Sequence, residues 1–72
     1  MKHKSDISIG FRCFDFLMEK YGTVGNVLKS TPIKKSVIYS WANGDTVPSA
    51  YWLQYLVEMG ADGNYLLTGV KK

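Results

Sequence analysis

The 72-residue chain has a single cysteine, Cys13, and a single histidine, His3, and this scarcity excludes two kinds of small protein. One thiol cannot form an intrachain disulfide, so a disulfide-stabilised secreted scaffold is excluded and the reducing cytoplasm is the expected location. One cysteine and one histidine also fall short of the ligand set that a zinc site needs. We therefore expect no metal site.

Membrane and enzyme signatures are absent as well. The sequence has no apolar run near the roughly 18 residues that a membrane span needs, so no membrane association is expected. It has no nucleophile placed with a base, no paired catalytic carboxylates and no glycine-rich phosphate loop. We expect neither an enzyme nor a protein that carries a cofactor or a small-molecule ligand.

Acidic residues are absent from the stretch between Lys20 and Gly44, although four lysines lie in it: Lys20, Lys29, Lys34 and Lys35. All six Asp and Glu residues lie outside this stretch, and the chain has a formal net charge of +3 at pH 7. Phosphate binding favours such a stretch because each neutralised phosphate of a nucleic acid releases counterions. A chance cluster of lysines is the alternative interpretation.

The chain length allows one domain, and a hydrophobic content of 46% is enough for the dense core that so short a chain requires. We expect residues 1–5 to be a flexible basic arm and residues 6–72 to be that single domain. Its predicted fold is all-α, a compact bundle of about five short helices. These helices are expected at about 6 or 8 to 21, 23–30, 34–43, 47–60 and 63–68.

Local signals predict where these helices begin and end. Thr23 is a suitable N-cap for the second helix, and Pro32 ends it because the residue before a proline avoids the α-helical region. Pro48 is expected in the first turn of the fourth helix. The remaining signals are three helix-ending glycines and one capping aspartate: Gly22, Gly44, Gly60 and Asp62.

Apolar periodicity predicts the buried side chains. The expected core-facing positions are Gly10, Cys13, Phe14, Leu17, Met18 and Tyr21 in the first helix, Ala50, Leu53, Leu56 and Val57 in the fourth, and Tyr65, Leu66 and Leu67 in the last. Trp41 and Trp52 are expected to pack in the core. Phe11 and Phe16 point away from the first helix's apolar face. They either cover a neighbouring helix, which we favour, or mark a subunit contact.

The third helix has two chemically distinct faces. At about 100° per residue, Ile38 and Trp41 lie together and can pack inward. The opposite arc of about 140° contains only hydrogen-bonding side chains without an acid: Lys35, Ser36, Tyr39, Ser40 and Asn43. Lys35 can donate to guanine O6 and N7, and Asn43 can serve a phosphate. Any amphipathic helix has a polar outer face, but solvated faces usually contain Glu or Asp.

Two short helices joined by a tight turn, with this outer face on the second, resemble the lambda-repressor-like helix-turn-helix domains, especially those of phage CI-type repressors. The resemblance covers about Gly10 to Gly69. The matching residues are Thr23, Val27, Ile33, Ser36, Ile38, Trp41, Asn43-Gly44, Thr46, Pro48-Ser49, Trp52-Leu53, Gly60 and the closing Tyr65-Leu66-Leu67-Thr68-Gly69.

The resemblance implies a sequence-specific transcriptional repressor of phage or prophage type, acting in the cytoplasm of a bacterial host. Its third helix, about 34–43, would lie in the major groove of a double-stranded DNA operator. Bases would be contacted by Lys35, Ser36, Tyr39 and Ser40, and the DNA backbone by Thr23, Lys34, Asn43 and Gly44. A homodimer on an inverted repeat is expected, and such repressors often carry a further C-terminal oligomerisation domain.

The sequence departs from this family at positions that affect docking. Pro32 occupies the usual turn glycine, whose φ is often positive, and proline cannot adopt that angle. Asp45 replaces a frequent lysine and would repel a phosphate. Two alternatives follow: a Cro-like regulator or an antitoxin that uses the same helices, and a protein-interaction module that has kept this fold and lost DNA binding. Pro32, Asp45 and the surplus aromatic residues favour the second.

Overall fold

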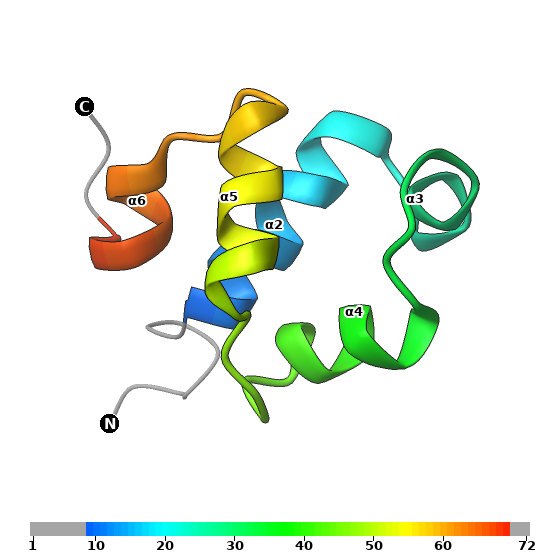
Figure 1. The fold of residues 1–72 in the computed structure, drawn as a ribbon. Coiled ribbons are helices and arrows are strands. Elements are labelled where there is room, and N and C mark those ends of the chain that lie inside the picture. Colours follow the sequence, from blue (N-terminus) through cyan, green and yellow to red (C-terminus); the bar gives the residue numbers. More distant parts are fainter. Residues whose placement is uncertain (1–8, 70–72) are drawn as a thin grey trace.

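Five α-helices follow one another over residues 9–69, the range that the computed structural model describes, and this range contains no strand. They are α2 (Ile9–Tyr21), α3 (Val24–Ser30), α4 (Lys35–Ala42), α5 (Ala50–Glu58) and α6 (Gly63–Thr68) (Figure 1). The radius of gyration is 11.2 Å, as expected for a compact domain of this length. The predicted all-α bundle is confirmed. The expected basic arm and the expected start of the first helix lie outside the described residues.

The predicted caps of α3 and α6 are confirmed. The backbone N–H of Asn26 donates to Thr23 Oγ1 over 3.1 Å, and Asp62 Oδ1 accepts from the N–H groups of Asn64 and Tyr65 over 3.0 and 3.3 Å. Each of these bonds satisfies an N–H group that the first turn of a helix leaves without a partner. Both helices therefore begin where a side-chain acceptor is available.

The predicted place of Pro48 is wrong by two positions. α5 begins at Ala50 with Ser49 as its N-cap, so Pro48 precedes the cap instead of occupying the first turn. Pro48 is buried, and its ring restricts the preceding Val47 to extended conformations. The chain therefore stays extended through Pro48 and turns into a helix only after Ser49, whose ψ is 167°.

The core forms around α2, which packs against α3, α4 and α6. α3 and α4 lie at one end of the molecule and α6 at the other (Figure 1). The fully or nearly buried apolar residues are Cys13, Leu17, Val27, Ile33, Ile38, Trp41, Leu56, Ala61 and Leu66. The Trp41 ring meets Trp52 edge to face, with ring centroids 6.2 Å apart. The inward orientation predicted for Ile38 and Trp41 is confirmed.

Several core predictions for α5 and α6 are wrong. Ala50 is exposed, Val57 is 45% exposed and Leu67 is 54% exposed, although all three were expected to face the core. In α5 only Leu56 is fully buried, and Leu53 is half-buried. These helices have few neighbours in the described structure, so a single narrow stripe on each is covered and the apolar residues beside it stay in contact with solvent.

The aromatic residues on α2 contact their own chain. Phe16 is partly buried against the core, and the ring of Phe11 lies 6.3 Å from that of Phe14. The packing of Phe16 agrees with the intramolecular interpretation, whereas the Phe11–Phe14 contact lies within α2 and does not test it. Phe14, Met18 and Tyr21 also pack against the core as predicted, each of them partly buried.

A buried arginine joins α2 to the end of α6. Arg12 is only 7% exposed, and its Nε donates to the Leu66 carbonyl over 3.0 Å while Nη2 donates to the Leu67 carbonyl over 3.3 Å. The last carbonyls of a helix lack intrahelical donors, and a cation there also complements the helix dipole. Arg12 therefore stabilises a six-residue helix that is too short to be stable alone.

α2 and α4 approach each other so closely that one contact position admits only glycine. A Cβ atom on the buried Gly10 would lie 2.8 Å from the Thr46 carbonyl oxygen and 3.1 Å from the Trp41 Cα atom. Both neighbours are backbone atoms, which cannot rotate away as a side chain can. Gly10 thus sets the distance between α2 and the C-terminal end of α4.

Replacing Gly10 with alanine tests this contact. Gly10→Ala is expected to lower the free energy of unfolding by about 1–3 kcal/mol, because the added methyl group must push two backbone segments apart. Urea unfolding followed by circular dichroism measures the change. Gly25→Ala is the matched control: the nearest atom to its added Cβ would be Thr23 Oγ1 at 3.8 Å, an ordinary contact distance, so a gain of about 0.5–1 kcal/mol is expected. Equal stability of Gly10→Ala and the parent protein would contradict the contact.

Candidate nucleic-acid interface

The turn between α3 and α4 is held by a buried threonine. Thr31 Oγ1 donates to the Val27 carbonyl over 2.9 Å and accepts from the Ile33 N–H over 3.2 Å. Its backbone is extended, with φ −134° and ψ 162°, as the residue before Pro32 requires. The positive φ angles of the described residues belong to Gly22, Gly44, Gly60 and Gly69, so this turn uses none, as predicted from Pro32.

α4 exposes the residues expected to contact bases near its start. Lys35 and Ser36 are exposed, and Tyr39 is 44% exposed, one turn after Lys35. Ile38 and Trp41 are buried on the opposite side of the same helix and fix its rotation. The structure therefore brings Lys35, Ser36 and Tyr39 together on one solvent-facing surface.

Ser40 differs from these three residues. It is half-buried, and its hydroxyl lies 2.8 Å from Thr46 Oγ1 in a hydrogen bond. A base contact by Ser40 would compete with this bond. The pair instead joins the last turn of α4 to the loop that follows it, which gives Ser40 a positioning role in that loop.

The end of α4 is closed by its own backbone. Asn43 is the C-cap, and Gly44 follows in the left-handed region with φ 75°. The Gly44 N–H donates to the Trp41 carbonyl over 3.1 Å, and the Asp45 N–H donates to the Ser40 carbonyl over 3.0 Å. These two bonds form a Schellman motif. Because the Gly44 amide already has an acceptor, a phosphate contact in this loop falls more naturally to the exposed Asn43 side chain.

The remaining backbone-contact candidates lie at helix starts. Thr23 is exposed and its hydroxyl oxygen caps α3. Lys34 is the exposed N-cap residue of α4, and its side chain makes no capping hydrogen bond. With Lys35 it places two adjacent positive charges at the start of the helix. Thr23 therefore has a structural task, whereas Lys34 remains available for an anion.

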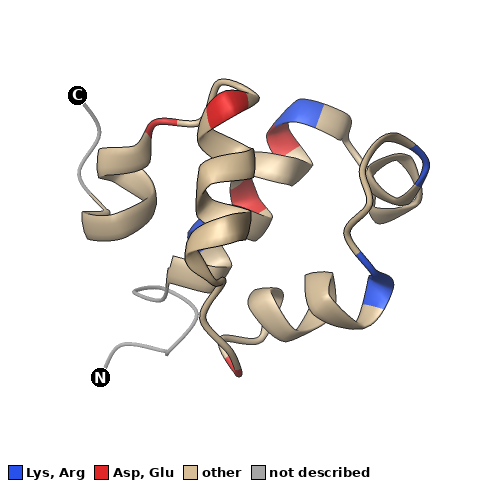
Figure 2. Ribbon diagram, in the orientation of Figure 1, with Lys and Arg blue, Asp and Glu red and all other residues tan. Residues whose placement is uncertain are grey.

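Acidic residues are unevenly distributed over the described structure. Figure 2 shows basic residues on α3, at the start of α4 and on α2, and acidic residues also on α2, at the end of α5 and beside α6. α3 and α4 contain no acidic residue, but Asp45, an exposed acid, follows α4 directly. The α4 surface is therefore favourable for phosphates at its start and less so beyond Asn43.

Comparisons with protein-family models, curated proteins and solved structures found no match. The resemblance to phage repressors thus stays a prediction that depends on the residues of this chain.

Within residues 9–69 no group of three or more His, Cys, Asp or Glu side chains lies close enough to hold a metal ion, and no helix is long and apolar enough to cross a membrane. Cys13 is completely buried, and this burial raises the pKa of its thiol from 9.0 to about 12 despite the neighbouring Arg12 charge. Cys13 is therefore a protonated core residue, as predicted.

Sequence reasoning missed the hydrogen bonds of Thr31 and Thr46, which hold the turn before α4 and the loop after it, although Thr46 was one of the residues that carry the family resemblance. A threonine directly before Pro32 offers one usable signal, since an extended residue can turn its hydroxyl back to the preceding helix. No comparable signal marks Thr46. Its contact with Ser40 depends on the path of a loop that local patterns do not specify.

Removing the Thr31 hydroxyl is expected to weaken the turn. Thr31→Val keeps the shape of the side chain and deprives the Ile33 N–H of its acceptor, so we expect a loss of about 1–3 kcal/mol in unfolding free energy. Thermal and urea unfolding give the measurement. Thr68→Val provides the comparison, because Thr68 Oγ1 also donates to the carbonyl four residues earlier but is exposed to water. A larger loss at Thr68 than at Thr31 would show that the buried hydroxyl does not hold the turn.

Proposed function

We propose that this protein is a sequence-specific DNA-binding transcriptional repressor of phage or prophage type, with α4 as the recognition helix. The observation that carries the proposal is the acid-free exposed face of α4, formed by Lys35, Ser36 and Tyr39. B-DNA's major groove is about 12 Å wide and admits one α-helix whose side chains can hydrogen-bond to base edges.

The side chains of α4 divide into base contacts and phosphate contacts. Lys35 can donate to guanine O6 and N7, and the small Ser36 lets the helix approach the bases closely. Tyr39, one turn later, has a hydroxyl within reach of a base or a phosphate. Lys34 and Asn43 flank α4, whose eight residues span about 12 Å, so they can hold phosphates at its two ends.

The function follows from occupancy of an operator. A homodimer would place two copies of α4 in successive major grooves of an inverted repeat, about 34 Å apart. The bound operator would then be closed to RNA polymerase, in the cytoplasm of a bacterial host. A Cro-like regulator or an antitoxin would use the same helix and differ in its regulated gene and in its protein partner.

Selection of DNA from a random pool tests the proposal. The parent chain, fused to a dimerising segment, is expected to enrich an inverted repeat, and a variant combining Lys35→Ala, Ser36→Ala and Tyr39→Ala is expected to enrich none. Lys20→Ala removes one positive charge at the end of α2 and should select the same repeat as the parent. No enriched sequence at low salt, with a protein shown to be folded, would refute the assignment.

Salt dependence separates DNA binding from a protein-interaction role of the same surface. If about four phosphates are neutralised, the affinity for the selected repeat should fall roughly 100-fold between about 50 and 200 mM salt. Lys34→Ala should reduce the steepness of this dependence, because one fewer phosphate is neutralised in each subunit. Titration of fluorescent DNA measures both. A salt-independent affinity would contradict phosphate binding by the α4 surface.

A further inference from the structure

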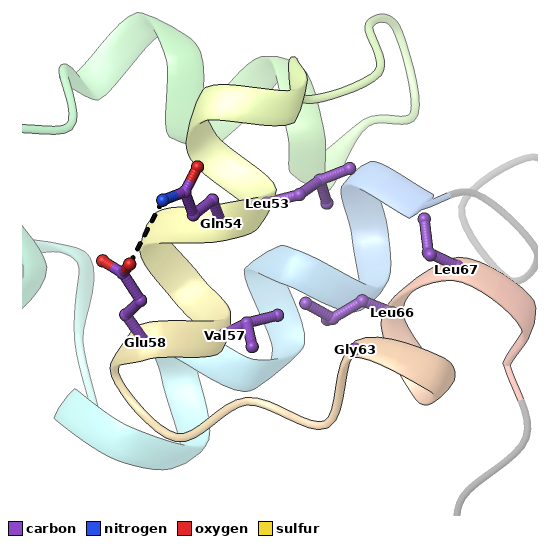
Figure 3. Close-up of a pocket in the computed structure, with 7 residues that line it drawn as sticks. All are labelled: Leu53, Gln54, Val57, Glu58, Gly63, Leu66 and Leu67. Atoms are coloured by element: carbon purple, nitrogen blue, oxygen red, sulfur yellow. Dashed lines mark hydrogen bonds between the residues drawn. The ribbon is translucent and has the colours of Figure 1, made fainter.

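An apolar groove of about 370 Å³ lies between α5 and α6. Figure 3 shows Leu53 and Val57 on α5 facing the side of α6 that carries Gly63, Leu66 and Leu67. Val57 and Leu67 are 45% and 54% exposed, so both walls of the groove present apolar surface to water. Covering such a surface is favourable because it removes apolar area from water.

Gly63 lines this groove close to Val57. A Cβ atom at this position would lie 3.3 Å from Val57 Cγ2, which is tighter than an ordinary van der Waals contact. A larger side chain at position 63 would fill the space between α5 and α6. The groove thus depends on a residue whose substitution can close it without removing any existing side chain.

A second, smaller hollow of about 160 Å³ lies beside the groove and shares its polar edge. Two tyrosines, Tyr51 and Tyr55, line it together with Gln54 and Glu58, and the last two also border the apolar groove. Gln54 Nε2 donates to Glu58 Oε2 over 3.2 Å, which orients the carboxylate (Figure 3). Aromatic rings together with a carboxylate are suited to an ammonium or guanidinium group.

The tyrosines of this hollow are held by neighbouring aromatic rings. The Trp52 ring meets Tyr51 at a centroid distance of 4.9 Å and Tyr55 at 5.7 Å, in both cases edge to face. Tyr51 nevertheless remains 64% exposed. Two aromatic side chains are therefore positioned in advance, while a large part of the Tyr51 surface stays accessible to a partner.

The two hollows together form the α5–α6 face, and the charge of this face indicates which kind of partner it can bind. α5 and α6 contain no lysine or arginine, and the charged residues of α5, α6 and the α6 cap are Glu58 and Asp62. Arg12, which bonds the end of α6 from α2, is buried and its donors are directed at the Leu66 and Leu67 carbonyls. A basic partner is therefore favoured, whereas DNA is disfavoured. A symmetric contact with a second copy would bring both copies of Glu58 and Asp62 into one interface, where like charges oppose each other.

We propose that the α5–α6 face docks an amphipathic, basic helix of another protein. The partner would insert an apolar side chain between Val57 and Leu67 and place a lysine or arginine against Tyr51, Tyr55 and Glu58. Residues three or four apart on a helix are neighbours, which suits two adjoining hollows. This docking uses none of the residues proposed to contact DNA, and it holds whether or not α4 binds an operator.

Titration of the isotope-labelled chain with a designed peptide tests the proposal without DNA. The probe is an amphipathic peptide of about 18 residues with leucine along one face and lysine beside it. Saturable chemical-shift changes are expected at α5 and α6. Two variants of the peptide, one with glutamate for each lysine and one with serine for each leucine, are expected to bind at least about tenfold more weakly.

Protein variants locate the site. Glu58→Lys is expected to weaken peptide binding at least about tenfold, and Gly63→Leu to abolish it by filling the groove. Glu19→Lys makes the same charge change at an exposed position of α2 that lines neither hollow, and it should bind like the parent. Circular dichroism of each variant confirms that it is folded.

Three results would overturn the proposal. One is the absence of saturable shifts at α5 and α6, and another is equal binding of the lysine and glutamate peptides. The third is a concentration-dependent dimer of the parent chain that Gly63→Leu disrupts, since the groove would then be occupied by a second copy. Shift changes confined to α3 and α4 count with the first result, because the peptide would have bound elsewhere.

Discussion

The backbone contact at Gly10 is the constraint on which the position of α4 depends. Because no side chain separates α2 from Trp41 and from the carbonyl of Thr46, the C-terminal end of α4 rests directly on α2. Ile38 and Trp41 then fill the space behind the helix, and Thr31 ties its preceding turn to α3. With the inner side fixed at three places, the opposite side of α4 is exposed by necessity.

The molecule has two surfaces of different chemistry, the exposed side of α4 and the α5–α6 face. Trp41 touches Trp52, which in turn supports the tyrosines of α5, so one aromatic cluster links the α4 surface to the α5–α6 face. Lysines lie on the first surface and Glu58 and Asp62 on the second. The proposed DNA contact and the proposed docking of a basic helix therefore use surfaces of opposite charge within one small domain.

Local chemistry explains what could be predicted from the sequence. The cap at Thr23, the cap at Asp62 and the positive φ of Gly44 each depend on residues within a few positions, so these three helix ends were predictable, unlike the start of α5. The exposure of apolar side chains on α5 and α6 was not predictable. Apolar periodicity identifies a stripe on a helix, but it does not show how much of that stripe a neighbouring helix covers. Arg12 was missed for a related reason: its acceptors lie 54 and 55 residues away.

The candidate site on α4 was also predictable only in part. Helical phase correctly placed Lys35, Ser36 and Tyr39 on an exposed face, but it also placed Ser40 there, and the family resemblance added Gly44 to the expected DNA contacts. The structure engages both residues internally, Ser40 through Thr46 and Gly44 through the Trp41 carbonyl. Specificity would then depend on the first half of α4, with the second half holding the helix to its loop. Asp45 follows α4 directly, so its carboxylate would repel a phosphate if the C-terminal end of α4 docked closely on DNA. An α4 that enters the groove with its N-terminal end would avoid this repulsion.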